Sequence, residues 1–141
     1  RSHALRFRRQ KSRGATVMEL SSHAQDWMRC AHESWASFAA GGHGMIVEHF
    51  VADPKWVGHF DQVLRRRHVR RVWVYVTAPL QVLETREKAR VVEQGGVLGL
   101  ARWSRGIDAG HTWDIHLDGT RPPADLVADL WKLLKQRQMV I

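Results

Sequence analysis

The sequence predicts an α/β fold in which helices cover both faces of a parallel sheet. Three short stretches, at 45–50, 69–77 and 113–118, have the composition of β-strands, and amphipathic helical patterns separate them. Strands that alternate with helices imply right-handed crossovers and hence a parallel sheet. The chain has 141 residues, of which 44% are hydrophobic, so we expect one domain with one core.

The first predicted helix spans 20–38, where apolar residues recur at every third or fourth position. Gly41 and Gly42 are expected to end it, because glycine is a poor helix former. The stretch 45–50 begins with three apolar residues and ends near polar ones. This pattern is typical of a buried strand with polar groups at its C-terminal end.

A second helix is predicted to begin at Asp53 and Pro54, which suit the N-cap and the first helical position. Its apolar stripe runs through 56–64, and the basic cluster 65–67 complements the negative end of the helix dipole. The strand 69–77 is rich in β-branched and aromatic residues. We therefore expect it to be buried on both faces.

A third helix is expected after Pro79, and its charged residues continue as far as Arg90. The glycines that follow, within 95–99, favour a flexible hinge rather than a phosphate-binding loop, because they neither follow a strand nor open a long helix. A short helical segment is expected at 100–103.

Residues 113–118 alternate between apolar and polar side chains, which indicates a strand with one buried face. Pro122 and Pro123 begin a final helix whose apolar stripe lies within 126–134. Three strands are few for a parallel sheet, and none of them has the polar character of an edge strand. We therefore expect a partner strand to be missing from the sheet.

Basic residues gather at the N-terminus of the chain. The formal net charge is +8, from 22 Lys+Arg against 14 Asp+Glu, and no acidic residue precedes Glu19. The sequence thus predicts a basic, poorly ordered arm at 1–19 and a folded domain at 20–141. Such an arm also permits non-specific nucleic-acid binding, which is the least favoured of the functional hypotheses.

Several kinds of site lack their sequence signature. The single cysteine, Cys30, forms no disulfide within the chain, and no apolar stretch suits a membrane span or a secretory signal, so we expect a cytoplasmic protein. No zinc-protease, serine-hydrolase or dinucleotide motif occurs. Among the nine histidines, His43, His49 and His59 are candidates to converge, but their spacing gives no metal signature.

One constellation of charged residues suits phosphoryl transfer. Arg86 and Arg90 lie four residues apart on one helical face, and Arg102 and Arg105 follow the glycine hinge. Glu48 lies near the end of the predicted strand 45–50. Phosphoryl transfer needs a carboxylate near magnesium and mobile arginines that close over the phosphates. The same arginines also suit ion pairs on a solvated helix face, so both interpretations stay open here.

Three tracts carry a resemblance to a known family. They are VWVYVTAPLQVLETREKAR at 72–90, GLARW at 99–103 and TWDIHLD at 112–118. Together with the helix at 21–40 and the stretch at 45–50, they resemble the chloramphenicol phosphotransferase-like family over roughly residues 20–135. The resemblance implies an α/β kinase fold of the P-loop NTPase type, truncated at its N-terminal strand.

The resemblance implies the reaction of that family, in which the γ-phosphate of ATP is transferred to a hydroxyl of a small molecule such as chloramphenicol. The resemblance implies ATP and Mg²⁺ as cofactors and a small-molecule acceptor as partner. It implies Arg86 and Arg90 as catalytic lid residues that bind the nucleotide phosphates together with Arg102. It also implies Glu48 as a residue near magnesium.

The chain departs from the family pattern in ways that bear on activity. It contains no Gly-x-x-x-x-Gly-Lys-[Ser/Thr] motif, and the family's catalytic aspartate has no counterpart. We therefore expect the chain alone to be inactive and to represent the C-terminal two-thirds of such a kinase. The alternative is an inactive remnant or interaction module, and self-association through an uncovered sheet edge is expected in either case.

Overall fold

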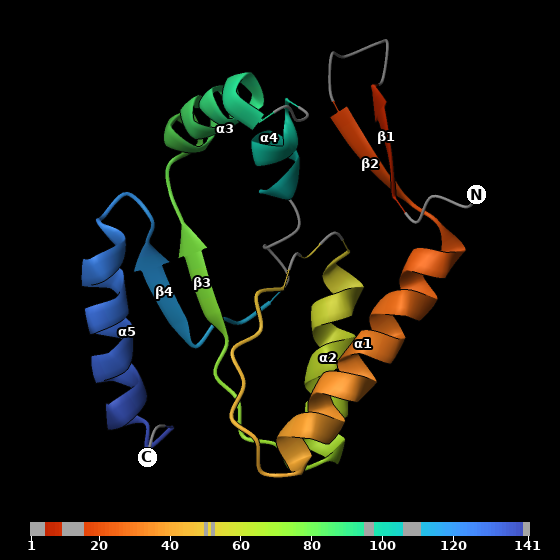
Figure 1. The fold of residues 1–141 in the computed structure, drawn as a ribbon, viewed down its shortest axis with the longest axis vertical. Helices are drawn as coiled ribbons and strands as arrows, with labels where there is room; N and C mark the ends of the chain where they lie inside the picture. The colour runs from red at the N-terminus through yellow and green to blue at the C-terminus, as the bar shows by residue number, and fades with distance from the viewer. Residues whose placement is uncertain are drawn as a thin grey trace.

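The computed structural model describes residues 5–9, 16–49, 51, 53–94, 98–105 and 111–139, and Figure 1 shows their arrangement. From α2 onward the regular structure follows the alternation expected from the sequence. A pair of strands is added at the N-terminus, and no described strand separates α1 from α2. In chain order the elements are β1 (Leu5–Arg9), β2 (Thr16–Leu20), α1 (Ser22–Ala40), α2 (Pro54–Arg66), β3 (Val74–Thr77), α3 (Leu80–Gln94), α4 (Leu100–Ser104), β4 (Ile115–Asp118) and α5 (Pro123–Gln136).

The strands β3 and β4 form a two-stranded parallel sheet, in register from Val74 opposite Ile115 to Thr77 opposite Asp118. In Figure 1, α5 lies on one side of this sheet and the α1–α2 pair lies on the other. The predicted α/β class with a parallel sheet is therefore confirmed. The predicted number of strands is wrong, because the described residues of 45–50 have no regular structure.

The N-terminal segment differs from the predicted poorly ordered arm. Within it, β1 and β2 pair as antiparallel strands, with Leu5 opposite Leu20 and Arg9 opposite Thr16. β2 leads into α1 after a single residue, Ser21. Residues 1–4 and 10–15 of the expected arm lie outside the described part of the chain.

The ends of α1 and α2 follow from local capping. The Ser21 hydroxyl accepts a hydrogen bond from the Ala24 amide at 3.3 Å, and Gly41 caps the other end of α1. The Asp53 carboxylate accepts the Lys55 amide at 2.9 Å, and Pro54 occupies the first helical position of α2, as predicted. The sequence thus determines both helices at their termini.

The main core lies between α1 and α2. Ala36 packs there with three buried residues of α2, namely Phe60, Val63 and Leu64. Trp73, just before β3, adds a ring whose centroid is 5.8 Å from that of Phe60. β3 itself is only partly buried, and Val76 is 56% exposed, so the prediction of burial on both faces is wrong. β4 matches its prediction, because its apolar residues are buried and its polar ones are exposed.

The helices around the sheet are less deeply packed than α1 and α2. Within the described part of the chain, α3, α4 and α5 contribute no fully buried side chain. α3 begins directly after Pro79, whose carbonyl oxygen accepts the amide of Val82 at 2.9 Å. α5 begins at Pro123 after Pro122, as predicted.

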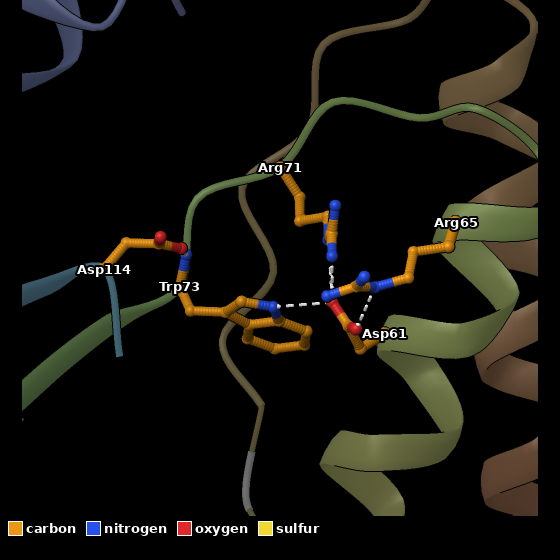
Figure 2. A network of polar contacts seen from close by, with 5 residues as sticks. All are labelled: Asp61, Arg65, Arg71, Trp73 and Asp114. Carbon is orange, nitrogen blue, oxygen red and sulfur yellow. Dashed lines mark hydrogen bonds and ion pairs between the residues drawn. The ribbon is translucent and has the colours of Figure 1, made fainter. Parts of the chain in front are cut away.

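A polar network fastens α2 to the start of β3 (Figure 2). The Asp61 carboxylate accepts Nε of Arg71 at 2.7 Å, Nε of Arg65 at 2.6 Å and the indole N–H of Trp73 at 3.2 Å. The Trp73 amide in turn donates to the Asp114 carboxylate at 2.8 Å, just before β4. Burial alone would raise the pKa of Asp61, but these three donors outweigh it and hold the pKa below its usual value.

We expect Asp61→Asn to lower the free energy of unfolding by about 2 kcal/mol, because it leaves two arginines without their part-buried charge partner. Urea unfolding at pH 7 measures the change. Asp129→Asn is the matched control, since its ion pair with Arg121 lies on the surface. Equal losses in the two variants would contradict a special role for Asp61.

Candidate functional site

The carboxyl ends of β3 and β4 form one edge of the sheet, which is where α/β proteins bind ligands. A cavity of about 350 Å³ opens there between the strands, α3 and the start of α5. Its lining combines apolar side chains with two arginines. The lining residues are Val76, Thr77, Ala78, Leu83, Arg86, Gly119, Arg121, Pro123 and Leu126.

Gly119 lets the ends of the two strands approach each other closely. Its amide donates to the Thr77 carbonyl oxygen at 2.7 Å, and a Cβ at this position would lie 3.0 Å from the same oxygen. A larger residue would therefore push the strand ends apart. The preceding Asp118 turns its carboxylate onto the amide of Thr120 at 2.9 Å and onto its hydroxyl at 2.8 Å. These two donors lower the pKa of Asp118, so the carboxylate is ionised at neutral pH.

Arg86 reaches this cavity from α3. Its Nη1 donates to the carbonyl oxygen of Gly119 at 2.7 Å, which places the guanidinium at the carboxyl end of β4. Arg121 lies on the other side and pairs with Asp129 at 2.6 Å; that hydrogen bond raises the pKa of Arg121. Two permanent positive charges thus flank one cavity. The arrangement suits the oxygens of a phosphate or carboxylate.

The other predicted lid arginines are placed differently. Arg90 is exposed one turn farther along α3 and is not among the residues that line the cavity. Arg102, on α4, donates two hydrogen bonds to the Glu84 carboxylate, at 3.1 and 2.8 Å. Glu87 accepts the amides of Gly99 at 2.8 Å and Ala101 at 2.9 Å, so it caps the start of α4. Two glutamates of α3 therefore hold α4 in place.

Glu48 is exposed and lies in the irregular segment before α2, not at the end of a strand. Among the residues that the structure describes, no three His, Cys, Asp or Glu side chains form a set that holds a metal ion. Mg²⁺ in such enzymes is bound mostly by substrate phosphates and water, with one or two carboxylates. The two arginines at the cavity therefore suit the oxygens of a phosphate group, whereas the described residues do not fit a magnesium site made by protein alone.

Three residues at this edge were not predicted as site residues. They are the last residues of β3 and β4, Thr77 and Asp118, and Arg121, three residues after the end of β4. Their signal in the sequence is their position, because residues that follow parallel strands meet at one edge of a sheet.

Histidines converge elsewhere, between α1, α2 and the segment before α2. Nε2 of His32 faces Nε2 of His49 at 2.7 Å, and Nδ1 of His32 faces Nδ1 of His59 at 2.9 Å. Of the three predicted candidates, His49 and His59 thus meet around His32, while His43 packs against Phe38. A metal ion needs ligand atoms that point at one position, but the two ring nitrogens of His32 point in different directions.

His32 is fully buried, with 0% of its surface exposed, and its ring stacks on that of Phe60 at 4.6 Å. Burial, aided by the neighbouring His49 and His59, lowers its pKa from 6.5 to about 4. The ring is therefore neutral at pH 7. A neutral imidazole has one donor and one acceptor nitrogen, which suits a central position between two other imidazoles.

The fold and the edge cavity define an α/β protein whose candidate site is a cavity between two arginines at the carboxyl end of a parallel sheet. The family model described as chloramphenicol phosphotransferase-like protein matches residues 3–135, and the chain belongs to this family. The match confirms the resemblance predicted from the sequence. It also begins well before residue 20, so it includes β1 and β2.

Membership in this family suggests a phosphotransferase-type function and fits a kinase-like fold. No curated protein and no solved structure gives a significant match to the chain. Among the helices that the structure describes, none has the length and apolar character required to cross a lipid bilayer.

Proposed function

We propose that the chain forms the lid and acceptor side of an ATP-dependent phosphotransferase that acts on a hydroxyl of a small molecule. The observation that carries this proposal is the position of Arg86. The side chain projects from α3 and donates to Gly119 at the carboxyl edge of the sheet, beside Arg121. The family supplies the reaction class, and the edge cavity supplies a place for the transferred phosphoryl group.

The chemistry proposed for this edge is electrostatic. A transferred phosphoryl group spreads negative charge over its three equatorial oxygens, and guanidinium groups that already lie beside it stabilise this charge. Arg86 exchanges its bond with the Gly119 carbonyl oxygen for one with a phosphate oxygen. Arg90 and Arg102 join the phosphates only if α3 and α4 close over the edge, and Glu48 as a residue near magnesium stays part of the proposal for the complete site.

The phosphate loop has to come from outside these 141 residues, because the sequence contains no such motif. The proposed acceptor is a hydroxylated molecule of the chloramphenicol type, and the proposed location is the cytoplasm, where ATP is supplied. Self-association through the open edge of β3 is a separate proposal that the oligomeric state in solution tests.

We expect the Arg86 cavity of the isolated chain to bind the phosphates of ATP with a dissociation constant above about 1 mM, since backbone amides and a lysine supply most of the phosphate affinity in P-loop proteins. Isothermal titration calorimetry with ATP and Mg²⁺ checks this result. The chain fused to a strand and phosphate loop from a family member is then expected to transfer phosphate from labelled ATP to chloramphenicol or a related alcohol.

The two measurements separate the competing functions. Tight ATP binding that Arg86→Gln abolishes would contradict the division of roles between the phosphate loop and the lid. A correctly folded fusion that binds ATP and transfers no phosphate to any hydroxylated acceptor would favour an interaction module, the alternative suggested by the missing motif.

A further inference from the structure

The two faces of the β3–β4 sheet differ sharply in chemistry. On one face Ile115 and Leu117 are buried. On the other face the register places Tyr75 beside His116, followed by Thr77. Helices that pack on a parallel sheet normally meet branched aliphatic residues. Tyrosine, threonine and histidine are instead amphipathic residues, typical of a wall that contacts both a ligand and water.

A second cavity, of about 570 Å³, lies over this amphipathic face. Its volume falls within the range of small-molecule sites. The wall is completed by residues from the end of α4 and from the segment before β4. Besides Tyr75, Thr77 and His116, the lining residues are Arg105, His111, Thr112 and Trp113.

Aromatic rings form most of the wall. The rings of Tyr75 and Trp113 are stacked, with centroids 5.0 Å apart and planes 19° from parallel. His116 meets the Tyr75 ring edge-on at 5.8 Å, and His111 meets Trp113 edge-on at 4.7 Å. The arrangement fixes the ring planes before any ligand arrives. A planar aromatic ring can therefore stack on the wall at little cost in conformational entropy.

The charge of the wall favours an anion. Arg105 is exposed, and no carboxylate is among the lining residues that the structure describes. Asp118, which pairs with Thr77 in the sheet register, already accepts two hydrogen bonds from Thr120 and does not line the cavity. Arg105 together with the hydroxyls of Thr77 and Thr112 can bind a carboxylate or phosphate.

We propose that this cavity binds a planar aromatic ring that carries an anionic group. The proposed ligand stacks on the outward face of the Tyr75–Trp113 pair and directs its anion to Arg105. This site differs from the Arg86 cavity, since Thr77 is the one residue common to the two linings. The proposal does not depend on phosphoryl transfer.

Four small molecules, each added to the full chain, test separately whether the site recognises the aromatic ring and the anionic group. Benzoate and AMP each combine an aromatic ring with an anion, and they distinguish an aromatic acid from a nucleotide as the source of the ligand. Benzyl alcohol keeps the ring without the charge, and cyclohexanecarboxylate keeps the charge without the ring. The readout is the indole N–H signal of Trp113 in ¹H–¹⁵N spectra, assigned with Trp113→Phe.

We expect benzoate or AMP to shift the Trp113 signal saturably, with an affinity at least tenfold above that of the probes lacking ring or charge. An unmoved Trp113 signal with both aromatic anions overturns the proposal. Equal affinity for benzyl alcohol or cyclohexanecarboxylate also overturns it, because ring and anion would then not be recognised together.

Arg105→Gln is expected to weaken binding of the preferred probe by about tenfold, because it removes the cation of the site. Arg29→Gln is the matched control, since Arg29 is exposed on α1. His116→Ala, on an exposed position of β4, tests the aromatic wall without a buried substitution. Unchanged affinity in both Arg105→Gln and His116→Ala would refute the site. The Arg86→Gln variant should bind the probe with unchanged affinity, because Arg86 does not line this cavity. Binding of the probe is therefore tested independently of the phosphotransferase proposal.

Discussion

Lowering the pH from 7.5 to 5.0 is expected to reduce the free energy of unfolding by about 2 kcal/mol through His32 alone. The pKa of His32 in the folded protein is about 4, against 6.5 for a free histidine. The unfolded chain therefore takes up a proton in this interval while the folded protein does not. The stability that depends on this residue is complete above pH 6.5 and decreases as the pH falls toward 4.

The cause of this pH dependence is the packing of His32. Its ring has no exposed surface, lies against Phe60 and faces the nitrogens of His49 and His59. A proton on His32 would add an unpaired charge inside the α1–α2 core. Glu33, the nearest acidic residue that opposes the shift, is already bound to Arg66 and Arg67.

Urea unfolding at intervals of half a pH unit measures the effect, and the range above pH 5 avoids most carboxylate titration. His32→Gln should lose most of the pH dependence, whatever its absolute stability. His23→Gln, the same change at an exposed position of α1, should retain it. Parallel pH profiles for the two variants would show that His32 is not the group responsible.

In a fusion that carries a phosphate loop and a catalytic aspartate, Arg86→Ala is expected to lower kcat by about 10³-fold while KM changes little. The reason is that the guanidinium contacts the phosphoryl oxygens chiefly when charge develops on them. Arg90→Ala should have a comparable effect only if lid closure brings this second arginine to the phosphates. Steady-state kinetics and the melting temperature, measured together, separate catalysis from stability.

Arg137→Ala is the structural control for Arg86→Ala. Arg137 also donates to a backbone carbonyl oxygen, that of Asp114 at 2.9 Å, but at the amino end of the sheet. Arg86→Ala loses one exposed hydrogen bond, and Arg137→Ala loses one together with a surface ion pair to Asp114 at 3.8 Å, so small changes in Tm are expected for both variants. A change in kcat of less than tenfold for both Arg86→Ala and Arg90→Ala would contradict the lid assignment. These arginines would then belong to a solvated helix face without a role in catalysis.

Elements with local signals could be predicted from the sequence. Asp53 with Pro54, and Pro122 with Pro123, determine where helices begin through contacts within a few residues. The strand prediction is wrong for the described residues 45–49, because a strand also requires a partner, and pairing is not encoded locally. The pair β1–β2 was missed because the charge of the segment indicated an arm, whereas its pairing joins residues up to 15 positions apart, from Leu5 to Leu20.

The site residues also divide into those with a local signal in the sequence and those that only the fold brings together. The spacing of Arg86 and Arg90 indicated a basic helix face, but only the fold brings Arg86 to Gly119. His32 was missed as a member of the histidine cluster, because a polar residue in an amphipathic helix is normally exposed. Its signal was its spacing, since it lies four residues from both Met28 and Ala36 on the apolar stripe.

The uneven burial of the helices has a consequence for how the molecule opens. The deeply buried side chains belong mainly to α1, α2 and β4, whereas α3 and α4 contribute none among the described residues. Regions with little buried apolar surface unfold locally at a lower free energy than the whole domain. We therefore expect α3 and α4, which Glu84 and Glu87 join, to open as one unit. This opening uncovers Trp56, against which Leu100 and Trp103 of α4 pack, but leaves the cluster around Phe60 folded. Arg86 would then leave the cavity edge and return to it by local unfolding. This opening costs much less free energy than unfolding the whole protein.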